Sequence, residues 1–110
     1  MLTHEWHGGG NVFIRPNTLA KAGDAIEGHT HNFDHVTIVF TGSVKVTATG
    51  PDGAVQEGTF TAPAHFLVRA ECTHQITALM DNTTIWCVYA HRTPQGIIVQ
   101  EYTGWPEAYS

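Results

Sequence analysis

The sequence predicts an all-β fold, either a barrel or a sandwich of many short strands. Segments rich in β-branched and aromatic residues recur along the 110 residues, and Gly, Pro, Asn and Asp separate them at short intervals. No segment longer than about ten residues follows the helical period of 3.6. Short strands with regular turn signals between them are typical of sandwiches and barrels.

Nine strands are expected, each carrying β-branched or aromatic residues and each bounded by a turn signal. In order they are NVFIR (11–15), AIEGH (25–29), HVTIVF (35–40), SVKVTAT (43–49), AVQEGTFT (54–61), HFLV (65–68), HQITAL (74–79), TIWCVYAH (84–91) and IIVQE (97–101). The clearest connection joins the fourth strand to the fifth. There Asp52-Gly53 supplies the positive φ that a tight hairpin turn requires.

One domain is expected over residues 1–110, because a chain of this length suffices for one core and not for two. The core of the barrel should lie between residues 11 and 101. Residues 102–110 form an extended C-terminal tail, in which Tyr102 and Trp105 stand among polar residues without a strand pattern. We expect this tail to pack across the barrel or across a partner subunit.

Composition narrows the function classes. Acidic residues outnumber basic ones ten to five, the net charge is −5, and there is no Lys/Arg cluster of the kind that nucleic-acid binding requires. No apolar run approaches the roughly 20 residues of a membrane helix, and the first residues lack the basic-then-apolar order of a signal peptide. We therefore expect a cytoplasmic protein with no nucleic-acid or membrane partner. Sparse charge and the apolar faces of the outer strands predict a homodimer.

Two cysteines are too few for a disulfide framework, so both are expected to be free thiols. Cys87 stands in an apolar strand, where a buried cysteine behaves as a small packing residue. Cys72 lies two residues before His74, so its thiolate could bind a metal or react with a substrate.

The densest functional signal is a run of three histidines, His29, His31 and His35, between Gly23 and Gly42. Alternate side chains of a strand point to the same face, so the first two share a face, and His35 has the same parity if the chain stays extended. Imidazole is the commonest protein ligand for transition metals. The run therefore predicts a metal site, although a His-x-His pair on a half-exposed strand can also be two solvated side chains.

This run resembles the first motif of the cupins. The spacing is Gly23, five residues, His29-x-His31, three residues, position 35, six residues and Gly42. Cupins ordinarily carry glutamate where this chain has His35. Because of this departure, two roles are open for His35: it could be a metal ligand or a free base.

The segment from Pro63 to Leu79 resembles a degenerate second cupin motif, and it makes His74 the matching ligand. The departures from the family pattern are Pro63 and Glu71 at the usual glycines, Arg69 at the usual proline and Ala78 at the usual asparagine. His65 competes for the ligand role. We prefer His74, because it begins an alternating strand after the expected hairpin. The two motifs span positions 23–78 and imply a small single-domain cupin, a double-stranded β-helix or jelly-roll barrel.

The resemblance implies a first shell of four neutral imidazoles, from His29, His31, His35 and His74. Without a carboxylate to offset its charge, a divalent ion there would be a stronger Lewis acid and would favour anionic ligands. An octahedral ion would keep two positions open, whereas zinc could close as a structural tetrahedral site. We expect a divalent transition metal, foremost iron, with nickel, manganese, zinc, copper or cobalt as the other candidates. Its occupancy should fall as the pH drops through about 6.5.

The pocket around the metal is expected to be largely apolar and suited to a small organic ligand. Parity places Thr37 with His35 and Ile76 with His74, and Phe33 and Trp86 are candidate walls. The polar candidates for an acid, a base or a carboxylate clamp are Tyr89, Arg69 and Glu71.

Three functions stay open. The first is an iron(II) dioxygenase that acts on a small chelating substrate, as the resemblance to histidine-only cupin sites implies. The second is a metal-dependent isomerase, epimerase or lyase that acts on a sugar acid and works without oxygen. The third is a non-catalytic module that binds a metal or a small molecule.

Overall fold

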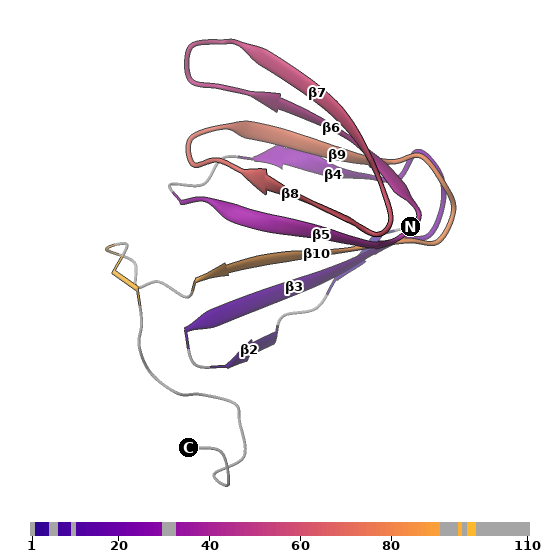
Figure 1. Cartoon of the computed structure of the whole chain (residues 1–110), viewed down its shortest axis with the longest axis horizontal. Helices are drawn as coiled ribbons and strands as arrows, with labels where there is room; N and C mark the ends of the chain where they lie inside the picture. Colours follow the sequence, from indigo (N-terminus) through magenta and orange to yellow (C-terminus); the bar gives the residue numbers. More distant parts are fainter. Residues whose placement is uncertain are drawn as a thin grey trace, which may run out of the picture.

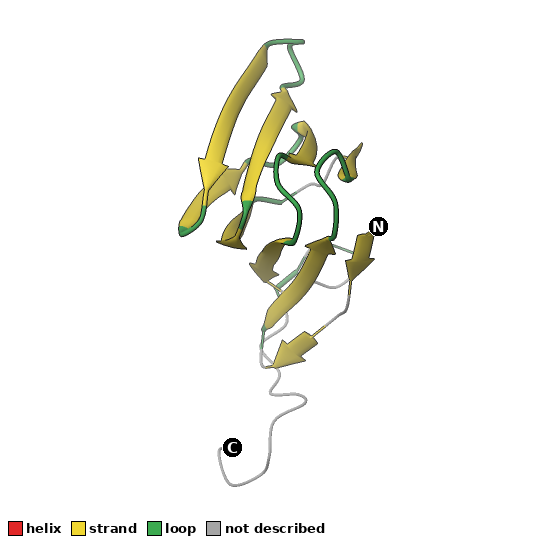
Figure 2. Cartoon of the chain, turned by 90° about the vertical axis from the view of Figure 1, so that its right-hand side faces the viewer, coloured by secondary structure: helices red, strands yellow, loops and turns green. Residues whose placement is uncertain are grey.

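The computed structural model describes the backbone of residues 2–4, 7–9, 11–29, 33–90, 95, 97 and 98, and the side chains of those from 11 onward except positions 28 and 29. Within these ranges it contains ten strands and no helix (Figures 1 and 2). The strands are β1 (Leu2–His4), β2 (His7–Gly9), β3 (Val12–Leu19), β4 (Ala25–His29), β5 (His35–Thr41), β6 (Ser43–Thr49), β7 (Val55–Thr61), β8 (Ala64–Val68), β9 (Thr73–Ala78) and β10 (Thr83–Ala90).

The strands form two antiparallel sheets. The larger sheet has the order β1-β3-β10-β5-β8, with β2 also paired to β3, and the smaller has the order β4-β9-β6-β7. Consecutive strands therefore alternate between the sheets at several points, as a jelly roll requires. The predicted all-β fold class is confirmed. No helix in the described part of the chain has the length and apolarity needed to cross a membrane.

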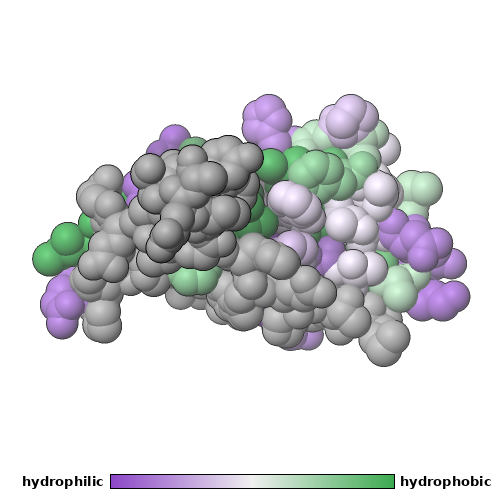
Figure 3. Space-filling model, turned by 90° about the horizontal axis from the view of Figure 1, so that it is seen from below, coloured by the Kyte–Doolittle hydropathy of each residue, from purple (hydrophilic) through white to green (hydrophobic). Residues whose placement is uncertain are grey.

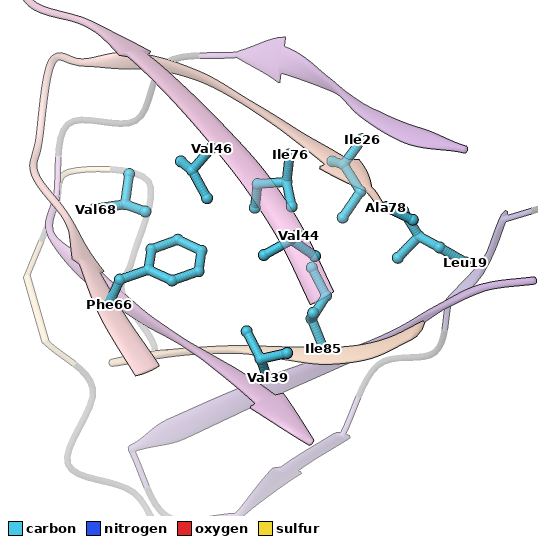
Figure 4. Close-up of a cluster of buried hydrophobic side chains, with 10 residues drawn as sticks. All are labelled: Leu19, Ile26, Val39, Val44, Val46, Phe66, Val68, Ile76, Ala78 and Ile85. Carbon is cyan, nitrogen blue, oxygen red and sulfur yellow. The ribbon is translucent and has the colours of Figure 1, made fainter. Parts of the chain in front are cut away.

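The core fills the space between the sheets (Figure 4). Inward positions alternate with exposed ones along β5 and β9, which is the period-2 pattern of a half-buried strand. The largest fully buried apolar side chains are Leu19, Ile76 and Ile85, and the rings of Phe60 and Phe66 stack at 4.6 Å. The full cluster comprises Leu19, Ile26, Val39, Val44, Val46, Phe66, Val68, Ile76, Ala78 and Ile85.

Strand β3 continues four residues beyond the predicted end at Arg15, and it passes through Pro16. Proline lacks the N–H that a sheet ladder uses. Pro16 pairs with Trp86 of β10 on one side. On the other side, β2 covers positions 12–14 and β1 covers positions 17–19, so Pro16 stands where one short partner has ended and the next has not begun. Strands β1 and β2 were not predicted, and the predicted strand 97–101 lies mostly outside the described residues.

The predicted hairpin between β6 and β7 is confirmed. Gly53 has φ +84°, and its N–H donates to the Gly50 carbonyl at 2.9 Å. Every residue of β6 from Ser43 to Thr49 is paired with β7.

The turn between β5 and β6 packs against the start of β10. Gly42 has φ +80°, and a Cβ built on it would stand 2.8 Å from the Cα of Thr83. The Thr41 hydroxyl donates to the Asn82 carbonyl at 2.8 Å and accepts from the Thr84 N–H at 3.0 Å. The backbone of Gly42 lies so close to Thr83 that a side chain at position 42 has no room.

Candidate functional site

His35 begins β5 and points into the barrel. Its side chain is 4% exposed, and it shares the inward face with Thr37 and Val39, both fully buried. Both ring nitrogens of His35 are buried. The shared face of His35 and Thr37 is as predicted from parity.

His74 lies on the opposite sheet and is 2% exposed. It shares the inward face of β9 with Ile76 and Ala78, as predicted, while Thr73 and Gln75 are exposed. The imidazoles of His35 and His74 lie 5.2 Å apart between ring centroids. The two strands thus bring together two histidines that are 39 positions apart in the sequence.

One ring nitrogen of His74 has a backbone partner. Its Nδ1 lies 3.4 Å from the Cys72 carbonyl, so the tautomer that donates from Nδ1 leaves Nε2 as the lone-pair nitrogen. An outer hydrogen bond of this kind commonly orients a metal-binding histidine. The group of Cys72 that lies beside His74 is thus its backbone carbonyl.

The backbone places position 29 directly opposite His74. β4 pairs with β9 at Ile26↔Ile76 and at His29↔His74, with a register shift between them. Glu27 and Gly28 therefore face Gln75 alone, which defines a one-residue β-bulge. In a regular strand, positions 26 and 29 would lie on opposite faces of the sheet. Because directly opposed positions share a face, the bulge brings position 29 into register with the inward row of β9.

The remaining predicted ligand, His31, lies outside the described residues. Among the side chains that the structure describes, no three His, Cys, Asp or Glu groups gather closely enough to hold a metal. His65, the alternative second-motif histidine, is exposed on β8 and is paired with Ile38. Its outward direction favours His74 as the inward histidine of this segment.

The turn between β8 and β9 carries two of the predicted polar groups, Arg69 and Glu71, and both are exposed. Glu71 has φ +63°, a left-handed conformation that glycine adopts most readily. The motif that this segment resembles has glycine at this position, and a positive φ is a conformation that glycine adopts readily. The Ala70 N–H donates to the Asp34 carboxylate at 2.7 Å, which ties this turn to the residue before His35.

Tyr89 stands on the inward side of β10 beside His35, with 6.4 Å between their ring centroids. Phe33 lies 5.1 Å from the Tyr89 ring and Phe13 lies 6.0 Å from it, so aromatic rings surround this phenol. Burial raises the pKa of Tyr89, the positive charge of Arg15 lowers it in part, and Cys87 raises it further. Tyr89 therefore lies beside His35, and Phe33 lies beside Tyr89.

Arg15 was missed by the sequence analysis. It follows the parity of the buried Asn17 and Leu19 along β3, is paired with Cys87, and its Nε is buried. Its positive charge acts on both Cys87 and Tyr89. The alternation of β3 would have revealed this inward cation if the strand had been extended past Pro16.

Trp86 and Ile76 were both proposed as pocket residues, but only Ile76 lies inside the barrel. Trp86 is paired with Ile38 and packs against the exposed Phe40, with 4.7 Å between ring centroids. Its neighbours Ile85 and Cys87 point inward, so Trp86 points outward. The prediction that Trp86 is a wall of the His35 pocket is corrected on this ground.

Cys87 is the centre of a small buried polar group. Its Sγ lies 3.8 Å from the Thr37 hydroxyl and 3.8 Å from the Asn17 amide nitrogen. Burial raises the pKa of the Cys87 thiol, while its contacts with Thr37, Arg15 and Asn17 lower it in part. Both cysteines are free.

Raising the pH above the ordinary thiol pKa of 9.0 should destabilise the protein through Cys87. The unfolded thiol ionises first, so the unfolded state binds fewer protons there, and the free energy of unfolding falls as the pH rises. Urea unfolding at pH 7, 9 and 10 should show a steeper loss for the wild type than for Cys87→Ala. If the free energy of unfolding falls equally with pH in the two proteins, the Cys87 thiol is not the cause of the loss.

Comparison with known proteins gives matches at the level of structure. No protein-family model matches the sequence, and no curated protein matches it. A cupin superfamily protein from Desulfitobacterium hafniense has a TM-score of 0.69 at 13% identity, over 83% of this chain and 78% of that one. KdgF from Halomonas sp. has a TM-score of 0.70 at 14% identity, over 86% and 82% of the two chains.

Oxalate decarboxylase from Bacillus subtilis has a TM-score of 0.69 at 19% identity. The match covers 79% of this chain and only 23% of the decarboxylase. At sequence identities this low, the structural similarity shows that the folds are alike. The chain has the cupin fold.

Proposed function

We propose that the chain is a metal-binding cupin whose site comprises His29, His31, His35 and His74. The observation that carries this proposal is the meeting of His35 and His74 across the two sheets, with 5.2 Å between their ring centroids. The register of position 29 opposite His74 supports a third ligand from the same end of the barrel.

The described residues fit a divalent transition metal by the chemistry of their donors. Two inward imidazoles from facing sheets supply borderline nitrogen ligands, which suit iron, nickel, copper, cobalt and zinc. The Cys72 carbonyl lies 3.4 Å from the His74 Nδ1, and a hydrogen bond donated from Nδ1 would leave Nε2 for a ligand bond. A bound metal would supply Lewis acidity or redox chemistry toward a chelating substrate.

The reaction that we propose is the oxygen-dependent cleavage of a small chelating organic substrate, such as a β-diketone or an enediol. The Tyr89 phenol stands beside His35, and a phenol is protonated at neutral pH, so Tyr89 can act there as a hydrogen-bond donor. Arg15 is the inward cation that would hold an anionic oxygen of the substrate. Phe33 and Phe13 would exclude water around the phenol.

A lyase or isomerase without an oxygen requirement is the second candidate. Its support is the inward Arg15, which suits a carboxylate substrate, together with the oxalate decarboxylases among the proteins of similar fold. A non-catalytic binding module would use the same histidines and show no turnover.

Elemental analysis of the untagged protein, followed by oxygen-electrode assays on the iron-loaded protein, tests the proposal. Oxygen uptake with β-diketones, thiols or flavonols, lowered at least about ten-fold by Arg15→Met and less by Arg15→Lys, would support the oxygenase. Turnover of sugar acids or small dicarboxylates without oxygen would replace it with the second candidate. A tightly bound metal with no turnover would favour the binding module, and the absence of metal binding would overturn all three.

A further inference from the structure

Asn17 is a polar side chain in the interior of the barrel. It is 1% exposed, and it shares the inward side of β3 with the buried Leu19. The next positions across the sheet, Ile85 and Val39, belong to the apolar core drawn in Figure 4. On the outside of the molecule, hydrophilic and apolar residues are mixed, as Figure 3 shows for one face, and water can satisfy a polar atom there. The Asn17 amide is out of reach of bulk water.

The amide nitrogen of Asn17 has partners within the protein. Its Nδ2 donates to the Arg15 carbonyl at 3.0 Å and lies 3.8 Å from the Cys87 Sγ. These contacts fix the orientation of the amide, because turning it over would place Oδ1 against the carbonyl oxygen of Arg15, and both are acceptors. The part that Asn17 plays in the local structure therefore uses its nitrogen.

The amide oxygen of Asn17 is buried and has no hydrogen-bond partner in the part of the chain that the structure describes. Most buried polar groups in folded proteins have a partner, and an acceptor without one lowers stability. An apolar side chain at this inward position would avoid that cost. The oxygen therefore points to a donor that comes from outside the protein.

Arg15 lies one inward position closer to the accessible end of the barrel. Along β3 the inward side chains pass from half-buried at Arg15 to buried at Asn17, and along β10 they pass from half-buried at Tyr89 to buried at Ile85. A small molecule that enters beside Tyr89 would thus meet Arg15 first and Asn17 next. Same-face neighbours on a strand are about 7 Å apart, so one small molecule can reach both side chains.

We infer that Asn17 and Arg15 form a subsite for an anionic ligand that carries a hydroxyl group. The Arg15 guanidinium would hold the anionic oxygen, as in the proposed function on which this inference rests, and the hydroxyl would donate to the Asn17 Oδ1. The positive charge of Arg15 favours a neutral donor over an ammonium group, because like charges repel strongly in a poorly solvated interior. The ligand class is therefore a small hydroxy acid, and an amino acid is disfavoured.

Titration of the ¹⁵N-labelled full chain with matched acids tests the subsite. The pairs are 4-hydroxybutyrate with butyrate and 3-hydroxypropionate with propionate, which differ in the hydroxyl and in reach. In at least one pair, the wild type should bind the hydroxy acid about ten-fold more tightly than the plain acid. The side-chain amide signals of Asn17 should move further with that hydroxy acid. 4-Aminobutyrate should bind no better than butyrate.

Three variants separate the roles of the side chains. Arg15→Met should weaken the binding of hydroxy and plain acids alike, because both lose the guanidinium. Asn17→Leu should weaken only the hydroxy acid and bring the pair to within about two-fold. Cys87→Ala is the matched control, since it removes the sulfur beside Nδ2 and leaves Oδ1 in place, so the preference should persist. Circular dichroism checks that each variant is folded.

Each titration is run on zinc-loaded and on metal-free protein, with the metal content measured. Failure of the proposed metal site would appear as an absence of bound metal with the hydroxy-acid preference unchanged. A preference that Asn17→Leu abolishes supports the subsite. Equal binding of hydroxy and plain acids by the folded wild type overturns it, and an internal water is then the donor to Oδ1. A preference that Asn17→Leu leaves intact, or one that 4-aminobutyrate shares, also overturns it.

Discussion

Replacing His74 with alanine should reduce the bound metal from about one equivalent per chain to less than about a tenth. His74 is a buried, inward imidazole on β9 of the smaller sheet, and its backbone partner across the pair is position 29. Its loss would remove one of the proposed ligands and the facing partner of His35. Plasma emission analysis of protein purified without chelator measures the outcome.

The matched control is His65→Ala. His65 is exposed on the neighbouring strand β8, so its substitution removes an imidazole from the same segment without touching the interior. Metal content equal to that of the wild type is expected. If His65→Ala loses the metal and His74→Ala keeps it, the second-motif assignment is reversed.

Two substitutions of His35 test its role. His35→Glu restores the residue that cupins ordinarily carry and should retain metal, whereas His35→Ala should lose it if the imidazole is a ligand. Retention of metal by both variants, with turnover lost, would make His35 a base beside the metal.

Replacing Gly42 with alanine should lower the free energy of unfolding by roughly 2–4 kcal/mol. The added Cβ would stand 2.8 Å from the Thr83 Cα, and the φ of +80° is unfavourable for any side chain. The Cβ of Thr83 would be equally close, and neither its Cα nor its Cβ moves when the side chain changes rotamer, so no rotamer change relieves the clash. Urea denaturation followed by circular dichroism measures the difference.

Gly23→Ala separates the two causes. Gly23 has φ +94° but nothing within 4 Å of a built Cβ, so only the conformational cost applies, about 1–2 kcal/mol. If Gly42→Ala is no worse than Gly23→Ala, then the close approach to Thr83 is not what requires glycine.

Period-2 patterns in β5 and β9 suffice to place Thr37 beside His35 and Ile76 beside His74, because alternation is a local property. The bulge at Glu27 and Gly28 is invisible to that reasoning, since it depends on the pairing of β4 with a strand far along the chain. Parity counted straight through β4 cannot say which of its residues face His74.

The other differences between the sequence-based predictions and the structure have similar causes. Pro16 is tolerated because of a gap between two short partners, which no local signal reveals, and Arg15 was missed with it. Trp86 is an aromatic residue on a core strand, and its outward direction follows from the burial of its neighbours Ile85 and Cys87. Glu71 adopts a glycine-like conformation that its residue type would not suggest.

The bulge in β4 also divides this short strand into two parts with different structural constraints. Before the bulge, the buried Ile26 follows the spacing of the apolar core, and after it position 29 stands opposite His74 in the backbone register. The core half can therefore be repacked by substitution without changing the backbone register of position 29. A one-residue insertion or deletion between the two halves would instead invert the strand beyond it, so this stretch should tolerate changes of identity far better than changes of length.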